Sequence, residues 1–427
     1  MKEIRKSFDT TWDFREANTK ILTHCFHSYP AMMIPQVAGR LIEKYGKKAK
    51  LLFDPFCGTG TSLVEAIIRN INAIGTDLNP LARLIAKAKT TPIKIQTLDL
   101  YLRDFNEYIF CHRFSTNNSR SIVSPVFKNI DYWFATDVQE KLTIIDGYIR
   151  NIEEQDVKQF FKVAFSETIR EVSWTRNNEF KLYRMSERQI AVFAPDVFGL
   201  MENKLARNRN GLISFMNAKT NCSTKIFDFN SVEKIPEEII KEESVDLVVT
   251  SPPYGDSRTT VAYGQFSRLA NQWMGYDGAS LLDNQLMGGK RTDEVKNFRS
   301  NILNEVIQII LDKDNKRVKD VISFYSDYYK SIKNVSKVIR TGGFACYVVG
   351  NRRVKGVTVP TDEITMDFFS ANGFKHIETI IRNIPNKRMP SKNSPSNIPG
   401  QLDKTMSNEY IVVMQKPRSW KFFGRRS

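Results

Sequence analysis

One short segment combines a hydroxyl, two prolines and an aromatic ring, in the order Thr250-Ser251-Pro252-Pro253-Tyr254. The apolar run 245–249 before it predicts a buried strand that ends at the prolines, because proline cannot extend a hydrogen-bonded ladder and restricts the residue before it. The Ser251 hydroxyl and the backbone carbonyls are hydrogen-bond acceptors, and the Tyr254 ring is a flat face. A stiff loop with these groups is suited to hold a flat polar molecule by its edge and its ring.

A second segment, residues 54–62 (Asp-Pro-Phe-Cys-Gly-Thr-Gly-Thr-Ser), lies between an expected strand at 49–53 and an expected amphipathic helix at 63–68. Gly58 and Gly60 permit a tight turn and let the backbone approach a ligand closely, as in dinucleotide-binding turns. The carboxyl ends of strands in an open α/β sheet are where ligands bind. We therefore expect this glycine turn and the proline loop to face one ligand site.

Two carboxylates are placed to select the ligand of the glycine turn. Asp77 follows the next expected strand, 72–75, at a position where an acidic side chain accepts hydrogen bonds from a ribose diol. Asp54 stands at the turn itself, where a carboxylate suits an ammonium group better than a pyrophosphate. S-adenosylmethionine carries both groups, whereas NAD would match Asp77 alone. The alternative is a glycine turn with capping aspartates in an ordinary α/β protein.

A third acidic residue, Asp228, follows the expected strand 224–227 and would lie near the same edge of the sheet. From there its carboxylate could reach the adenine amino group of a nucleoside cofactor. The competing interpretation is a capping role ahead of Asn230 and Ser231. We expect Asp228 to contact the cofactor.

Strands and helices alternate along the chain except in its middle, where helical periodicity alone runs for more than a hundred residues. The pattern predicts an α/β protein with a Rossmann-like sheet, helices on both of its faces and a large inserted helical subdomain. The expected parts are 1–92 with the cofactor site, 93–222 as the helical insertion, and 223–427 with the proline loop and the later strands. Residues 255–299, rich in Gly, Asn and Lys, predict a mobile loop over the site.

The composition favours a polyanionic partner. The 427 residues carry a formal charge of +16, with a pI near 9.5, and such a field attracts phosphates over a long range. Five cysteines without a C-x-x-C spacing and four histidines that do not pair with them argue against a disulfide framework and against a metal site. The absence of an apolar membrane span or signal peptide predicts a cytoplasmic protein with no membrane partner.

Basic residues stand next to aromatic ones in the second half of the helical insertion, where Arg170, Arg176, Lys181 and Arg184 interleave with Trp174, Phe180 and Tyr183. Cations suit phosphates and rings suit exposed bases, so this pattern indicates nucleic-acid contact. A solvated face with packing aromatics fits the same pattern equally well. Further expected contacts are Arg258, just after the proline loop, and Lys387 and Arg388 in the basic, proline-rich loop 386–396.

Taken together, the two segments resemble those of S-adenosylmethionine-dependent amino-methyltransferases of DNA. Ser-Pro-Pro-Tyr resembles the cytosine-N4 branch, where adenine enzymes usually carry Asp-Pro-Pro-Tyr or Asn-Pro-Pro-Tyr. The resemblance covers most of the chain and implies a class I methyltransferase sheet, double-stranded DNA as substrate and a restriction–modification role with a cognate endonuclease as functional partner. The cofactor residues that it implies are Tyr29, Pro30, Asp54, Phe56, Gly58, Gly60, Thr61, Asp77, Asp228 and Thr250.

The chemistry of an exocyclic amine fits the proline loop. Such an amine is a poor nucleophile, because its lone pair is delocalised into the ring. Acceptors fixed at Ser251 and at the Pro252 carbonyl would localise that lone pair, with Pro253 stiffening the loop. Tyr254 would stack on the base, which must be flipped out of the duplex to be reached. Methylation of cytosine carbon-5 needs a cysteine nucleophile, and this loop has none.

Three alternatives stay open from the sequence. An adenine-N6 enzyme differs mainly in the residue at position 251. An RNA guanine-N2 methyltransferase has a similar glycine turn but usually Asp-Pro-Pro-Tyr and a separate N-terminal RNA-binding domain, whereas about 50 residues precede the first strand here. A non-catalytic DNA-binding protein on a methyltransferase scaffold is the third, although it would have no reason to keep both motifs.

Overall fold

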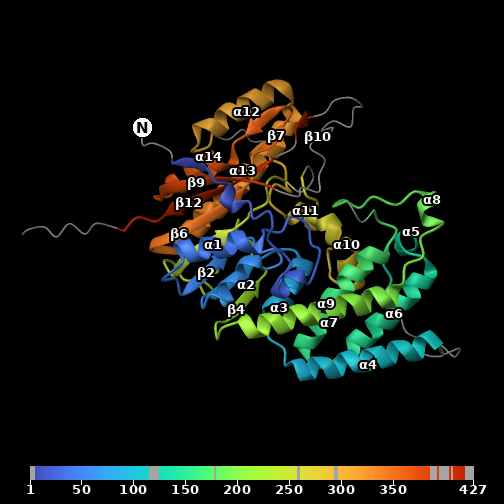
Figure 1. Cartoon of the computed structure of the whole chain (residues 1–427). Coiled ribbons are helices and arrows are strands. Elements are labelled where there is room, and N and C mark those ends of the chain that lie inside the picture. The colour runs from blue at the N-terminus through green and yellow to red at the C-terminus, as the bar shows by residue number, and fades with distance from the viewer. Residues whose placement is uncertain are drawn as a thin grey trace, which may run out of the picture.

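A central eight-stranded sheet organises the computed structural model, which describes residues 5–114, 125–176, 179–256, 260–292, 297–384 and 407–418 and the backbone of 392–393 and 403–404 (Figure 1). The strand order is β1-β9-β12-β6-β5-β2-β3-β4. In that order the strands are Lys6–Phe8, Lys375–Asn383, Asn408–Gln415, Ile339–Val349, Val245–Thr250, Leu51–Asp54, Asn72–Thr76 and Thr224–Phe227. The predicted α/β sheet is therefore present.

The topology is that of a doubly wound sheet with one reversed strand. Neighbours from β4 through β3, β2 and β5 to β6 are parallel, and β12 is antiparallel to both β6 and β9. Counted along the chain from β2, the strands of this sheet lie in the order 3-2-1-4-5-7-6, the arrangement expected of a class I methyltransferase. The order reverses between β2 and β5, and a crevice opens at such a switch point beyond the carboxyl ends of the strands.

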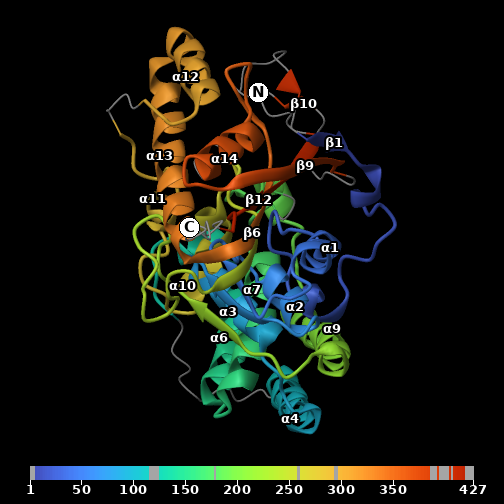
Figure 2. The ribbon, with the colours of Figure 1, turned by 90° about the vertical axis from the view of Figure 1, so that its left-hand side faces the viewer.

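Side chains on β5 alternate between the two faces of the sheet, as a strand buried on both sides requires. Leu247 and Val249 pack with α1 (Pro35–Tyr45) and α2 (Thr61–Ile67), while Val248 packs with α12 (Asn301–Lys313), α13 (Asn315–Val338) and α14 (Thr361–Ser370). Figure 2 shows α1 on one side of β6 and β12, and α13 and α14 on the other. Helices thus cover both faces.

The predicted helical stretch follows β3 and α3 (Pro80–Thr90). Its helices are α4 (Ile95–Phe114), α5 (Ile130–Trp133), α6 (Thr136–Asn151), α7 (Gln155–Val172), α8 (Glu187–Ile190) and α9 (Val197–Ala218). Figure 1 shows α4, α6, α7 and α9 gathered at one end of the molecule. One buried core joins Phe161 of α7 and Leu212 of α9 to Val64 of α2 and Leu81 of α3, so the insertion packs against two helices that flank the sheet.

The region after the proline loop differs from its prediction. Residues 263–273 form α10 (Tyr263–Trp273) and 282–285 form α11 (Leu282–Gln285), where a mobile loop was expected. Phe266, Leu269 and Trp273 lie at helical spacing and are buried in the core that includes α7. Their apolar spacing outweighs the surrounding glycines and polar residues because burial stabilises the helix.

Short elements complete the described chain. They are the 3-10 turns Thr10–Trp12 and Leu22–Cys25 and two small antiparallel pairs, β7 (Arg352–Val354) with β8 (Val357–Val359) and β10 (Lys392–Asn393) with β11 (Asp403–Lys404). None of the described helices is both long and apolar enough to cross a membrane.

Candidate functional site

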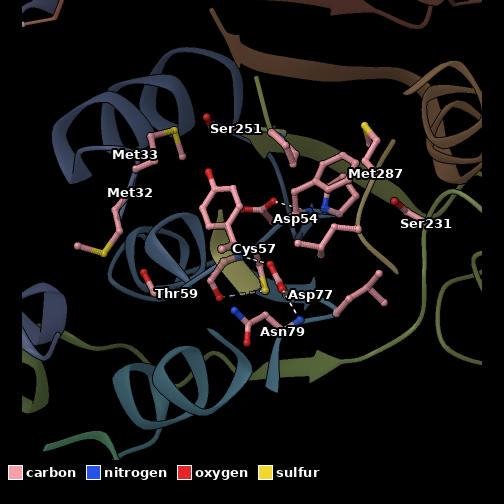
Figure 3. A pocket seen from close by; sticks show the side chains of 18 of the residues that line it. Met32, Met33, Asp54, Cys57, Thr59, Asp77, Asn79, Ser231, Ser251 and Met287 are labelled. Carbon is pink, nitrogen blue, oxygen red and sulfur yellow. Dashed lines mark hydrogen bonds between the residues drawn. The ribbon is translucent and has the colours of Figure 1, made fainter. Parts of the chain in front are cut away.

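A pocket of about 970 Å³, counting the open space at its mouth, lies beyond the carboxyl ends of β2, β3 and β5. We call it the switch-point pocket. Its lining comes from residues 29–33, 54–59, 61–62, 77–79 and 229–232 and from Ser251, Pro253, Tyr263, Leu286 and Met287. Figure 3 shows Met32 and Met33 on one side, Met287 and Ser231 on the other, and Ser251 at one rim. The glycine turn and the proline loop therefore face one pocket, as predicted.

The Asp54 carboxylate joins these two segments at the base of the pocket. Its Oδ1 accepts a hydrogen bond of 2.6 Å from the Thr250 hydroxyl and one of 3.1 Å from the Phe56 N–H, and its Oδ2 accepts from the Ser62 hydroxyl. Burial raises the pKa of Asp54 to about 6, although the three hydrogen bonds act in the opposite direction. A carboxylate has about four lone-pair sites, so one remains for a ligand.

The two glycines of the turn have positive φ angles for different reasons. Gly58, at φ +48°, lines the pocket, and a Cβ added there would meet no described atom within 4 Å. Gly60, at φ +77°, is the N-cap of α2, and an added Cβ would lie 3.0 Å from the Cβ of Ala86 in α3. The space over Gly58 thus belongs to the pocket, while Gly60 allows α3 to pack closely.

Asp77 lines the same pocket and orders the glycine turn. Its carboxylate accepts from the Gly58 N–H at 3.1 Å and from the Asn79 N–H at 2.8 Å. Burial raises the pKa of Asp77. The turn and the end of β3 are therefore fixed to each other by a group that also faces the pocket.

Asn79 and Tyr263 are pocket residues that the sequence analysis missed. The Asn79 side-chain amide donates to the Tyr29 hydroxyl at 2.7 Å and to the Ser267 hydroxyl of α10 at 2.6 Å. The Tyr29 ring stacks on Tyr263, with centroids 6.1 Å apart and planes at 15°. Asn79 is the N-cap of α3, where its side chain accepts from the Leu81 N–H. This role was predictable, because an asparagine before Pro80 is typical of a helix start. Nothing local to Tyr263 indicated that it would reach Tyr29.

The proline loop presents Ser251 and Pro253 to the pocket, while Pro252 is buried behind it. The Ser251 hydroxyl lies 3.1 Å from the Val348 carbonyl oxygen and 3.3 Å from the Tyr254 hydroxyl, and it donates to these acceptors. The described lining does not include Tyr254, whose hydroxyl donates to Glu409 of β12 at 3.0 Å. Burial, with the Glu409 charge as a smaller cause, raises the pKa of Tyr254, so this phenol keeps its proton.

Asp228 is placed differently from its prediction as a cofactor contact. Its side chain is 78% exposed, with Arg83 as a distant partner at 3.9 Å, and it is absent from the described lining of the pocket. Phe229, Asn230 and Ser231 line the pocket instead. The chain turns beyond β4, and this turn carries the following residues over the cavity while Asp228 points to solvent.

Seven of the residues expected to bind the cofactor belong to the described lining: Tyr29, Pro30, Asp54, Phe56, Gly58, Thr61 and Asp77. Thr250 and Gly60 are not in the described lining. Thr250 donates a hydrogen bond to Asp54, and Gly60 allows α3 to pack closely. Within the described part of the chain, no cluster of three or more histidine, cysteine or acidic side chains could hold a metal ion.

Two of the basic residues expected to contact nucleic acid pack against rings and carbonyls of the protein itself. Arg170 is only 8% exposed, donates to the carbonyls of Phe266 and Glu179, and lies over the Phe266 ring. Arg184 lies over the rings of Trp174 and Tyr132 and pairs with Glu187. These contacts favour the packing interpretation of the basic and aromatic pattern for these two residues, because each guanidinium finds carbonyl and ring partners.

The remaining basic candidates are placed as follows. Arg176 is exposed and Lys181 partly exposed, on the two arms of a hairpin closed by the Arg176 N–H to Tyr183 carbonyl bond of 2.8 Å. Arg258, Lys387 and Arg388 lie outside the described residues. Arg176 and Lys181 are thus the described members of the predicted set that can meet a phosphate.

Sequence relatives extend along nearly the whole chain. It is 42% identical to the type II methyltransferase M.MvaI of Kocuria varians over 422 residues, which cover 94% of this chain and 93% of that protein. It is 20% identical to the type II methyltransferase M.BsoBI of Geobacillus stearothermophilus, with 94% and 87% covered. A family model described as DNA methylase matches residues 1–88, the part with Tyr29, the glycine turn and Asp77.

Solved structures resemble the chain more distantly. TTHA0409 of Thermus thermophilus, in complex with S-adenosyl-L-methionine, is 18% identical and covers 44% of this chain and 53% of its own, with a TM-score of 0.23. The rRNA methyltransferase aviRa of Streptomyces viridochromogenes is 9% identical, covers 91% of this chain and 88% of its own, and has a TM-score of 0.32. Neither likeness is close enough to transfer the role of a residue.

Proposed function

The chain belongs to the type II DNA methyltransferase family, and we propose that it methylates the exocyclic N4 amino group of a flipped-out cytosine in double-stranded DNA. The observation that carries the choice of base is Ser251, which faces the switch-point pocket from the end of β5. The motif of the cytosine-N4 branch has serine at this position, whereas adenine enzymes usually have aspartate or asparagine. An adenine-N6 product is the alternative.

The switch-point pocket fits S-adenosyl-L-methionine, the methyl donor of this family. Asp77 would hold the ribose diol, and Asp54 would use its remaining lone pair for the methionine ammonium. The absence of a side chain at Gly58 leaves that part of the cavity open, and the buried Thr59 hydroxyl in the lining has no hydrogen-bond partner among the described residues. When bound, this cofactor supplies an electrophilic methyl group.

The protein's own groups would prepare the amine for that transfer. The Ser251 oxygen and the Pro252 carbonyl would accept hydrogen bonds from the two N–H groups of the amine. These hydrogen bonds would draw the nitrogen towards a tetrahedral geometry, which localises its lone pair. Both acceptors lie on a segment that two prolines stiffen. We retain Tyr254 as the ring that stacks on the flipped base, an interaction worth about 1–3 kcal/mol. No residue of the loop needs to form a covalent bond to the base.

The net charge of +16 supports DNA as the substrate. Arg176 and Lys181 are the described side chains that we propose for phosphate contact, together with Arg258, Lys387 and Arg388 outside the described part. A restriction endonuclease that cleaves the same sequence is the functional partner that we propose.

The identity of the methylated base is the direct test. Full-length protein is incubated with unmethylated DNA and isotope-labelled S-adenosyl-L-methionine, and the DNA is then digested to nucleosides for mass spectrometry. Label in N4-methylcytosine supports the proposal. Label in N6-methyladenine would overturn the choice of base while leaving the family intact, and RNA as a control substrate should take up no label.

A further inference from the structure

A chain of polar contacts leads from Ser251 away from the pocket to the far strands of the sheet. Ser251 lies 3.3 Å from the Tyr254 hydroxyl, and Tyr254 donates to Glu409 at 3.0 Å. Glu409, near the start of β12, forms an ion pair with Arg382 of β9. None of the motifs found in the sequence includes Glu409 or Arg382.

Arg382 holds the far end of this chain in place. It is 3% exposed, and besides Glu409 it donates to the backbone carbonyls of Trp12 at 2.7 Å and Asp13 at 3.2 Å. Arginine stays charged in proteins, so the guanidinium fixed in this way holds the Glu409 carboxylate by a charge-assisted hydrogen bond. Removing that carboxylate would leave a buried guanidinium with one partner fewer.

The fixed charge sets the direction of the hydrogen bonds that follow. A carboxylate can only accept, so the Tyr254 proton is directed to Glu409, and the Tyr254 oxygen is left to accept from Ser251. The other neighbour of Ser251, the Val348 carbonyl at 3.1 Å, can also only accept. Ser251 is therefore the donor in both contacts, and its single proton is used there. Towards the pocket, the Ser251 oxygen can act only as an acceptor.

We propose that Glu409 is a positioning residue which acts through Tyr254 to keep Ser251 a hydrogen-bond acceptor for the hydrogens of the target amine. The inference rests on the proposed function, because only an amine substrate needs acceptors at this point. Glu409 moves no proton. A hydrogen bond to a charged group is stronger than a neutral one, and linked hydrogen bonds polarise one another, so the Glu409 charge also makes the Ser251 oxygen a better acceptor.

The test is a double-mutant cycle with Glu409→Gln, Tyr254→Phe and the double variant in the full-length protein. The measurements are the single-turnover rate of methyl transfer to DNA, the dissociation constant of S-adenosyl-L-methionine and the melting temperature. Tyr254→Phe keeps the ring and removes only the hydroxyl, and a glutamine at 409 keeps the size of the side chain and removes the charge. We expect each single variant to lose about tenfold or more in rate with cofactor affinity within about twofold.

The decisive result is the rate of the double variant. If Glu409 acts through Tyr254, the double variant is no slower than the slower single variant, because the second change removes a link that is already broken. Independent effects would multiply, and a product of the two losses would overturn the proposal. Wild-type rate in Glu409→Gln, or a loss of cofactor affinity as large as the loss in rate, would overturn it as well.

The chain offers a matched control in the neighbouring strand. Glu378 of β9 accepts from the Tyr45 hydroxyl and pairs with Lys44, and none of the three belongs to the described lining of the pocket. Glu378→Gln should leave the transfer rate unchanged. The product of the wild-type enzyme separates the two proposals. If the wild type makes no amino-methylated DNA, the proposed function is wrong. If the wild type is active and the rate losses of the single variants multiply in the double variant, only the positioning role is wrong.

Discussion

The Thr250 hydroxyl donates a hydrogen bond of 2.6 Å to the carboxylate of Asp54, which is 196 residues away in the sequence. Asp54 ends β2 and Thr250 ends β5, the two adjacent strands between which the strand order reverses. The bond fixes the glycine turn relative to the loop that carries Ser251. A contact at the edge of the sheet therefore sets the distance between the glycine turn and the proline loop. If the two segments hold the two reactants of a transfer reaction, orientation of this kind contributes strongly to the rate.

Replacing Thr250 with valine should weaken this link at nearly constant side-chain volume. We expect a loss of about 1–3 kcal/mol in the free energy of unfolding, because a buried carboxylate oxygen loses a partner, and a lower affinity for S-adenosyl-L-methionine. Urea unfolding and calorimetric titration measure the two effects. Unchanged values for both would show that the bond contributes neither stability nor alignment.

Acidification should weaken cofactor binding through Asp54. Burial raises the pKa of this carboxyl to about 6, against an ordinary value of 3.8, so the charge that we propose for the ammonium is present well above pH 6 and lost as the pH falls through 6. The effect of Asp54 on folding stability has the opposite sign. Burial disfavours the ionised form in the folded protein, so protonation of Asp54 at lower pH favours folding. Titrations with S-adenosyl-L-methionine, from about two pH units above this pKa to one below it, measure the change in cofactor affinity. In Asp54→Asn the affinity should change little as the pH passes through 6.

Ser251→Ala should lower turnover far more than cofactor affinity. Loss of a fixed polar group at a reacting centre typically costs about 10²–10³ in rate, and the Ser251 hydroxyl is proposed to contact the amine and not the cofactor. Single-turnover kinetics and calorimetric titration give the two quantities. Ser214→Ala, an exposed serine that bonds to a carbonyl of its own helix α9, is the control and should behave as wild type. Equal losses in rate and in cofactor affinity would contradict the assigned role.

Alanine at the two glycines of the turn should have separable effects. Gly58→Ala would place a methyl group in the pocket without touching described protein atoms, so we expect cofactor affinity to fall and stability to drop only by the strain of a positive φ, about 1–2 kcal/mol. Gly60→Ala adds a close contact with Ala86 and should destabilise more. Melting temperatures and cofactor titrations compare the two, and the reverse ranking would contradict this division of roles.

DNA affinity should fall steeply with salt, and two arginines should respond differently to replacement. Arg176→Ala removes an exposed charge, so the slope of log K against log salt should become shallower by about 1 with the melting temperature unchanged. Arg170→Ala breaks buried hydrogen bonds and should lower the melting temperature instead. Binding titrations over a range of salt concentrations decide this, and an unchanged slope in Arg176→Ala would exclude that residue as a phosphate contact.

The sequence alone determined where the site lies and which groups surround it. Prolines follow the end of β5 and glycines form the turn between β2 and α2, and both rules are local, since they follow from the backbone of single residues. The alternation of strand and helix then places both loops at the carboxyl edge of one sheet. Asp54, Gly58, Asp77 and Ser251 could therefore be assigned to one pocket before any contact was known.

Only the tertiary structure decided how side chains divide between the pocket, the core and the solvent. Asp228 turns outwards and Arg170 inwards because each direction depends on partners far away in the chain, such as the Phe266 carbonyl for Arg170. The contact of Tyr254 with Glu409 spans 155 residues. Periodicity reports which face of an element is buried, and no local pattern encodes the partner that a polar side chain meets there. The acceptor role proposed for Ser251 depends on such a partner.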